Sequence, residues 1–207
     1  MKTLFIPVKS KISIDKYKIL QLSKQLPKDL AIAYSVQYEN QAREIKQILS
    51  KNHKISKFTQ VLGCSRPKIK SNAILLISDG RFHAVSLAQE TNLPIYIYEA
   101  NRLSKVSDKE IDDLKKKQKA SYVKFLNSKK VGILVSTKPG QQNLKQAIDI
   151  KNKLSKKEFY LFICNNINTA EFENFPEIQS WVNTACPRID MNDARIVNSD
   201  KIKPSQY

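Results

Sequence analysis

The sequence predicts an α/β protein made of two similar sub-domains, each with a parallel sheet and helices on both of its faces. Apolar, β-branched runs alternate with stretches of helical spacing, and this alternation occurs in both halves of the chain. Most of the runs are apolar throughout, which is typical of parallel strands buried on both faces. With 207 residues, 41% of them hydrophobic, the chain is long enough for one large domain or two small ones.

The first sub-domain is predicted to span residues 1–106. A short apolar run at 3–8 opens it, and its strands are expected at 30–36, 60–63, 73–78 and 94–99. Its helices are expected at 14–26, 38–50 and 82–91. Pro27 ends the first of these helices, since proline cannot continue a helical hydrogen-bond ladder.

The second sub-domain is predicted to span residues 128–207, with strands at 131–136, 158–164 and 181–186 and a helix near 141–155. Residues 107–127 form a charged connecting helix, for which Asp108 is the expected N-cap. A weak internal echo relates the two halves, because each delivers a cysteine at a strand end: Cys64 in VLGC and Cys186 in NTAC.

Composition excludes several classes of protein. The formal net charge is +17, but lysines are spread along the whole chain and carry no interleaved aromatic pattern. We therefore expect a solvated lysine surface rather than a nucleic-acid-binding protein. No run approaches the roughly 20 apolar residues of a membrane span, and no signal peptide is evident. Three widely spaced cysteines do not suggest a disulfide framework, so a cytoplasmic protein with no membrane association is expected.

Glycine is scarce, with four in the chain, and it indicates where a site lies. Average usage would give roughly 14 glycines, yet Gly63, Gly80, Gly132 and Gly140 all fall at strand ends or inside motifs. Four polar segments follow predicted strands: 63–64, 78–83, 136–141 and 183–188. Because the carboxyl ends of parallel strands share one edge, we expect these segments to converge there.

Plainer interpretations of the same residues stay open. Cys64 and Cys186 could be ordinary buried thiols, and for Cys164, within an apolar strand, that interpretation is favoured. Asp79 and Gly80 could form only a turn, and Arg188 could pair with Asp190. His53, in a polar stretch, is expected at the surface. Gly140 and Gln141 at a helix start would suit an anion or carboxylate.

Five segments together resemble a known family. They are FIPVKSKI (5–12), QVLGC (60–64), ISDGRFHA (77–84), GILVSTKPGQ (132–141) and VNTACPRID (182–190). They resemble the archaeal diphthamide synthases, the 2-(3-amino-3-carboxypropyl)histidine synthases. The resemblance implies three similar α/β domains that each supply one cysteine to a [4Fe–4S] cluster. It implies that S-adenosylmethionine binds the open iron and that radical cleavage transfers its aminocarboxypropyl group to a histidine of translation elongation factor two.

The resemblance also assigns residues. Cys64 and Cys186 match the cluster ligands of the family's second and third domains, and three thiolates would leave one iron open. Thr137, Gly140 and Gln141 resemble the S-adenosylmethionine loop, and Arg188 suits the carboxylate of that cofactor. Cofactor contacts are also expected from the DGRFH segment, which holds Asp79, Arg81 and His83, although the resemblance assigns it no exact role.

One departure from the family limits these expectations. The resemblance begins at the second domain, so we expect a separate chain to supply the first domain and the third cysteine. Cys164 does not match a family ligand. The chain alone is therefore expected to be inactive or severely impaired, and to work in a homo- or hetero-oligomer. The alternative is a non-catalytic scaffold or binding protein derived from the same family.

Overall fold

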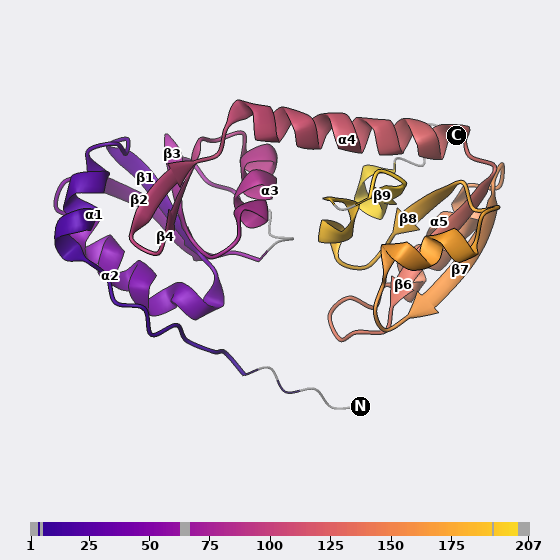
Figure 1. The fold of residues 1–207 in the computed structure, drawn as a ribbon, viewed down its shortest axis with the longest axis horizontal. Coiled ribbons are helices and arrows are strands. Elements are labelled where there is room, and N and C mark those ends of the chain that lie inside the picture. The colour runs from indigo at the N-terminus through magenta and orange to yellow at the C-terminus, as the bar shows by residue number, and fades with distance from the viewer. Residues whose placement is uncertain (1–3, 5, 63–66, 192, 203–207) are drawn as a thin grey trace. The chain divides into compact units, whose positions relative to one another are not determined.

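The chain folds into two compact units, Met1–Asp112 and Asp113–Tyr207. The structure is a computed structural model that describes residues 4, 6–62, 67–191 and 193–202 (Figure 1). The division between the units falls inside the long helix α4 (Asp108–Asn127). Each unit has its own sheet and its own core, and the two are described separately below.

The first unit holds a five-stranded sheet in the order β2-β1-β3-β4-β5. Its strands are β1 (Asp29–Tyr34), β2 (Lys54–Gln60), β3 (Ala73–Ile77), β4 (Ile95–Glu99) and β5 (Arg102–Lys105). The first four strands in the sheet order are parallel, and β5 returns antiparallel to β4. The chain moves outward in both directions from the β1–β3 pair, so the strand order reverses between β1 and β3.

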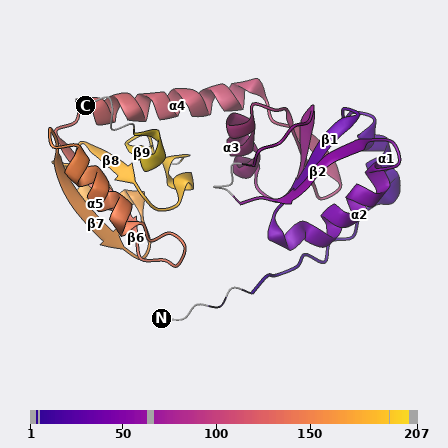
Figure 2. The same cartoon turned by 180° about the vertical axis from the view of Figure 1, so that it is seen from behind.

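Helices cover both faces of this sheet (Figure 2). They are α1 (Lys16–Ser23), α2 (Glu39–Leu49) and α3 (Arg81–Thr91), with the short 3-10 turn η1 (Val36–Tyr38) before α2. The helices α1 and α2 pack against one face, where Ile19 and Ile45 contact the cluster that includes Leu30 and Ile32. Successive strand residues point to opposite faces. Ala31 therefore faces the other side, where α3 lies.

The second unit holds a four-stranded parallel sheet in the order β7-β6-β8-β9. Its strands are β6 (Lys130–Ser136), β7 (Glu158–Cys164), β8 (Ser180–Asn183) and β9 (Ile196–Asn198). The strand order reverses between β6 and β8. The unit also contains α5 (Leu144–Lys153) and three 3-10 segments, η2 (Thr169–Asn174), η3 (Pro187–Met191) and η4 (Ser199–Lys201).

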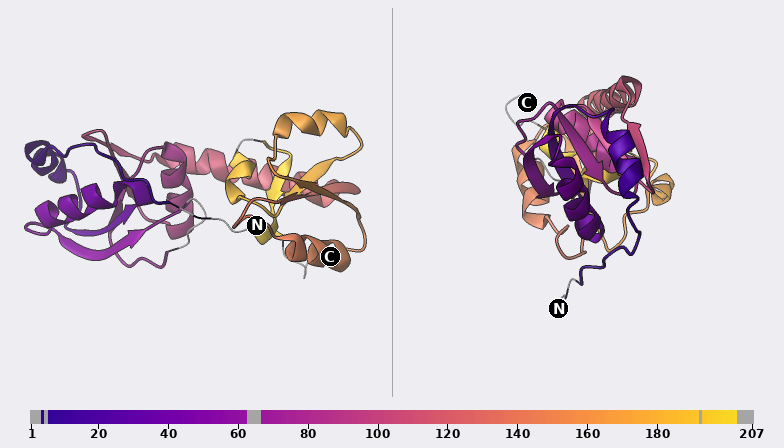
Figure 3. Two further views of the ribbon diagram at one scale, coloured as in Figure 1. Left: turned by 90° about the horizontal axis from the view of Figure 1, so that it is seen from below. Right: turned by 90° about the vertical axis from the view of Figure 1, so that its left-hand side faces the viewer.

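Two different layers cover this second sheet (Figure 3). On one face α5 and the end of α4 pack against β6 and β7, through Ala147, Phe125 and Val131. On the other face the cover is η2, whose Phe172 stacks on Trp181 with 4.1 Å between ring centroids. The predicted class, two α/β units with mostly parallel sheets, is confirmed, but one face of the second unit carries a 3-10 segment where a helix was expected.

Several local predictions were wrong. Residues 4 and 6–8 form no strand, and Leu4 and Ile6 are 83% and 74% exposed. The strand expected at 60–63 covers 54–60 instead. Polar and apolar residues alternate along it, so it does not stand out as an apolar run. His53 is buried rather than exposed, and its Nδ1 lies 2.9 Å from the Pro27 carbonyl oxygen. The short strands β5 and β9 were not predicted.

The ends of two helices also differ from prediction. Ser107, not Asp108, caps α4: its Oγ accepts from the Glu110 N–H at 3.3 Å, and its own N–H donates to Glu110 Oε2 at 2.9 Å. This is the reciprocal capping box that the sequence SDKE encodes. The helix expected from residue 141 begins at Leu144, so Gly140 and Gln141 lie in a turn before it.

Candidate functional site

Both sheets offer the kind of edge where ligands bind in open α/β proteins. Such ligands sit beyond the carboxyl ends of strands, at the point where strand order reverses. In the first unit this point lies after β1 and β3, and in the second after β6 and β8. Of the predicted site residues that the structure describes, all follow β3, β6 or β8.

In the second unit, the segment after β6 is held in place by backbone contacts to the end of β7. The Thr137 N–H donates to the Cys164 carbonyl at 3.0 Å, and the buried Ser136 hydroxyl donates to the Asn165 carbonyl at 3.2 Å. The Lys138 N–H donates back to Ser136 Oγ at 3.2 Å. Thr137 is exposed at the edge of the sheet, in a segment whose backbone is anchored.

The turn that continues this segment leaves free space beside the backbone of Gly140. Gly140 has φ +77°, and no atom lies within 4 Å of where its Cβ would be. The Gln141 N–H donates to the Lys138 carbonyl at 3.0 Å and closes the turn. Glycine is required here by backbone conformation. The space around it leaves room for a ligand to approach the chain.

Cys186 lies on a loop that three hydrogen bonds of Asn183 brace. Asn183 Nδ2 donates to the Cys186 carbonyl at 2.8 Å and to Asn198 Oδ1 at 2.7 Å, while its Oδ1 accepts from the Ala185 N–H at 2.9 Å. Asn198 Nδ2 in turn donates to the Pro187 carbonyl at 2.8 Å. Two buried asparagines at the ends of β8 and β9 therefore fix the backbone on both sides of a half-buried thiol.

The segments after β6 and β8 are joined to one another. Asn143 Nδ2 donates to the Thr184 carbonyl at 2.6 Å, and the Thr184 hydroxyl donates to the Leu134 carbonyl at 2.8 Å. The structure thus brings the 137–141 segment and the Cys186 loop to the same switch point, the edge of the sheet where strand order reverses between β6 and β8. Arg188, in η3, is exposed two residues beyond Cys186.

In the first unit, the DGRFH segment forms the passage from β3 to α3. Gly80 precedes α3 with φ +91°, a conformation that side chains rarely adopt. Asp79 is exposed and accepts from Gln37 Nε2 at 3.0 Å. His83 Nδ1 lies 3.5 Å from the buried Ser78 hydroxyl, and its ring packs on Phe82 with 3.8 Å between centroids.

Arg81 has an evident structural task. Its guanidinium pairs with both oxygens of Glu110, and Nη2 also donates to the Lys105 carbonyl at 2.9 Å. The hydrogen bond from Arg81 is the main cause that lowers the pKa of Glu110 to about 2. Arg81 therefore ties the start of α3 to α4 and β5, and a contact between Arg81 and a cofactor stays a prediction.

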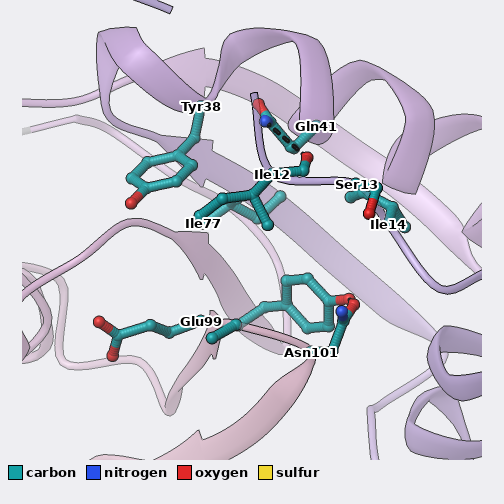
Figure 4. A pocket seen from close by; sticks show the side chains of 10 residues that line it. Ile12, Ser13, Ile14, Tyr38, Gln41, Ile77, Glu99 and Asn101 are labelled. Atoms are coloured by element: carbon teal, nitrogen blue, oxygen red, sulfur yellow. Dashed lines mark hydrogen bonds between the residues drawn. The ribbon is translucent and has the colours of Figure 1, made fainter. Parts of the chain in front are cut away.

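The first unit also contains a cavity that the sequence did not indicate (Figure 4). It has a volume of about 120 Å³ and lies beside the ends of β3 and β4. Its walls come from segments far apart in the chain: Ile12, Ser13, Ile14, Tyr38, Gln41, Ile77, Tyr98, Glu99, Ala100 and Asn101. No periodicity or motif in the sequence links these positions.

Cys164 is the last residue of β7 and lines a second cavity, of about 220 Å³, in the second unit. The other walls include the aromatic rings of Phe162, Phe172, Phe175 and Trp181. Burial raises the pKa of the Cys164 thiol, which disfavours the thiolate that an iron ligand requires. Cys164 is half-buried, as Cys186 is, so exposure alone does not separate the two thiols.

The other cysteine in question, Cys64, lies outside the described residues, as does Gly63. Among residues that are described, no three His, Cys, Asp or Glu side chains gather as a metal site. One half-buried thiol on a braced loop at the carboxyl edge of a sheet is nevertheless a donor suited to an iron–sulfur cluster. The second unit therefore fits the role of supplying one cluster ligand.

The fold and its edges define the chain as a protein of two doubly wound α/β units, with polar segments at both switch points. Residues 1–196 match the family described as putative diphthamide synthesis proteins. The chain belongs to this family.

Proteins with assigned activities are also similar to this chain. The 2-(3-amino-3-carboxypropyl)histidine synthase of Pyrococcus horikoshii is 29% identical over 92% of the chain, and that of Methanocaldococcus jannaschii is 28% identical over 100%. The crystal structure of Dph2 from Pyrococcus horikoshii with a 4Fe-4S cluster superposes with a TM-score of 0.78 at 26% identity. It covers 92% of this chain. The relatives are thus members of an aminocarboxypropyl transferase family.

The chain spans only part of these relatives. It covers 60% and 61% of the two archaeal synthases and 61% of the Dph2 chain. No helix in the described part of the chain is both long enough and apolar enough to cross a membrane.

Proposed function

We propose that this chain is part of a diphthamide synthase that transfers the 3-amino-3-carboxypropyl group of S-adenosylmethionine to a histidine of translation elongation factor two. The observation that carries this proposal is the junction in the second unit, where the braced Cys186 loop and the 137–141 segment meet at one switch point. The iron–sulfur cluster of the Dph2 relative and its similarity to this chain support a cluster here.

In this proposal Cys186 and Cys64 donate thiolates to a [4Fe–4S] cluster. When bound, the cluster supplies the electron that cleaves the sulfonium. Asn183 and Asn198 act as positioning residues, because they hold the backbone on both sides of Cys186. A fixed backbone keeps the thiolate pointing one way whether or not iron is present.

The remaining predicted residues bind and orient S-adenosylmethionine. The open turn at Gly140 admits the ligand to the backbone, Thr137 and Gln141 offer hydrogen bonds, and the Arg188 guanidinium pairs with the carboxylate. Orientation decides the product, since one of three carbon–sulfur bonds must break. Asp79 and His83 serve the same ligand from the first unit.

The third thiolate comes from a separate chain in this proposal, and the complex works in the cytoplasm. A scaffold that has lost the chemistry is the competing function, and it predicts no turnover in any assembly.

Anaerobic reconstitution with iron and sulfide tests the proposal. Cys64→Ala and Cys186→Ala should lose most of the cluster absorbance, whereas the matched control Cys164→Ala should keep it. With a candidate chain that carries one α/β domain and one motif cysteine, reductant should turn S-adenosylmethionine into methylthioadenosine. Arg188→Ala should weaken cofactor binding and leave the cluster intact. Deoxyadenosine as the main product, or no turnover with an intact cluster, would refute the mechanism.

A further inference from the structure

The cavity of the first unit is apolar in its depth and acidic at its mouth (Figure 4). Ile12, Ile14 and Ile77 form apolar walls. The Tyr38 hydroxyl and the Glu99 carboxylate extend to the same side of the opening. A pocket with apolar walls and a few polar groups that converge is the usual form of a small-ligand site.

The charged groups at and near this cavity are carboxylates, Glu99 in its wall and Asp79 next to Tyr38. Glu99 and the neighbouring Asp79 form no ion pair among the residues that the structure describes, although the chain has 36 lysines and arginines. Burial raises the pKa of Tyr38, and the charges of Asp79 and Glu99 raise it further. Both carboxylates therefore act on the same small region at the mouth of the cavity.

One wall carries an additional acceptor without a donor. Gln41 is 6% exposed, and its Nε2 donates to the Ser10 and Ile12 carbonyls at 3.0 Å each. This geometry leaves Gln41 Oε1 with no partner within the described part of the chain. A buried acceptor without a donor destabilises the fold relative to a satisfied one. This oxygen is fully buried, so the Glu99 carboxylate and the Tyr38 hydroxyl are the polar groups that a ligand at the mouth would meet.

We propose that this cavity binds a primary ammonium group carried on a short aliphatic stem. The stem would fill the apolar depth against Ile14 and Ile77, and the ammonium would lie at the mouth between the Glu99 carboxylate and the Tyr38 hydroxyl. Ammonium groups have three donors and no acceptor, which matches the Glu99 carboxylate and the lone pairs of the Tyr38 hydroxyl. This site stands independently of the proposed synthase function.

The ligand can have two sources, a lysine side chain of another protein or a free small amine. Both present the same butylammonium group to the cavity. Titration of the folded chain with n-butylammonium chloride, followed by the NMR shifts of the Tyr38 ring, tests the shared chemistry. Saturable binding in the millimolar range is expected for a ligand of this size.

Matched variants test the assigned contacts. Glu99→Gln should weaken butylammonium binding about tenfold, because a charge-assisted hydrogen bond is replaced by a neutral one. Tyr38→Phe should weaken it a few-fold. The control Glu158→Gln removes the same charge from the second unit and should leave the affinity unchanged. Equal affinities in the wild type and Glu99→Gln, with the fold verified by circular dichroism, would refute the contact.

Matched ligands test the chemical class and its source. n-Butanol has the same stem without charge, so equal affinity for butanol would overturn the ammonium assignment. Binding of N-acetyl-lysine methylamide as tight as that of butylammonium would support a protein lysine as the ligand. Exclusion of the blocked lysine with retained butylammonium binding would support a free amine. No saturation by either amine would overturn the proposal altogether.

Discussion

Individual glycines in this chain are required for different physical reasons, backbone conformation or close packing, although their sequence contexts look alike. Gly80 and Gly140 have positive φ, which explains why no side chain is present there. Gly132 has no such φ. A Cβ on Gly132 would lie 2.4 Å from the Trp181 ring, inside the sheet. Gly132 therefore reflects packing between neighbouring strands, whereas a role of Gly80 and Gly140 in a site stays a prediction.

Substitution of these two glycines should separate the two constraints. Gly132→Ala places a methyl group into the Trp181 ring, and overpacking of this kind costs about 1–3 kcal/mol or more. Gly140→Ala meets no atom and should cost about 1–2 kcal/mol through backbone strain alone. Urea unfolding followed by the fluorescence of Trp181, the single tryptophan, measures both free energies. A smaller loss for Gly132→Ala than for Gly140→Ala would contradict this interpretation.

Among the elements, α4 is held at each end by a different set of polar contacts. At its start, the Ser107–Glu110 capping box continues into the Arg81 ion pair. At its end, Lys157 Nζ donates to the Phe125, Leu126 and Ser128 carbonyls at 2.9, 2.7 and 2.7 Å. An ammonium at a helix C-terminus satisfies carbonyls that have no partner within the helix. Both ends of α4 are thus tied to neighbouring elements.

The contacts at the start of α4 should make stability depend on pH. The Arg81 hydrogen bond lowers the pKa of Glu110 from 4.5 to about 2 in the folded chain. A carboxyl group with a lowered folded pKa stabilises the fold above pH 4.5, and that contribution is lost as pH falls toward 2. Glu110→Gln should therefore destabilise the chain at pH 7 and make progressively less difference below pH 4.5.

Denaturant unfolding across this pH range measures the effect of Glu110→Gln. Asp112→Asn is the matched control, since Asp112 is exposed on the same helix and forms no ion pair within the described part. It should change stability little at either pH. A constant difference between the wild type and Glu110→Gln from pH 7 to pH 2 would exclude this role for the carboxylate.

The contacts at the end of α4 predict the effect of a second substitution. Lys157→Met keeps the aliphatic stem and removes the ammonium, which leaves three carbonyls without this donor. The expected loss is about 1.5–3 kcal/mol, the range for hydrogen bonds to a charged group. Lys156→Met changes an exposed neighbour and should be nearly neutral.

These elements show what the sequence could and could not predict. Strands such as β3 and β6 were predicted because five or more consecutive apolar residues are buried on both faces. The predicted position of the edge strand β2 was wrong, because its exposed lysines interrupt the run of apolar residues. The acidic cavity could not be predicted, because residues 12–14, Tyr38, Ile77 and Glu99 meet only through the fold. The motif residues at strand ends were found because parallel topology places such ends on one edge.

At the scale of the whole molecule, each unit closes its own core. The first is built on Leu30, Ile32 and Ile45, and the second on Ile133, Val135 and Phe125. The helix α4 has its start anchored in the first unit by Glu110 and its end in the second by Lys157. Two cores joined through one helix need not unfold together, and departure from two-state behaviour is common in such chains.

We therefore predict two thermal transitions for the isolated chain in scanning calorimetry. Glu110→Gln should lower the midpoint of the transition that belongs to the first unit, and Lys157→Met that of the other. Trp181 lies in the second unit, so its fluorescence should follow only the transition that Lys157→Met moves. A single transition that both variants shift equally would mean that the two units unfold as one cooperative body. The anchors at the two ends of α4 would then stabilise the whole chain jointly instead of one unit each.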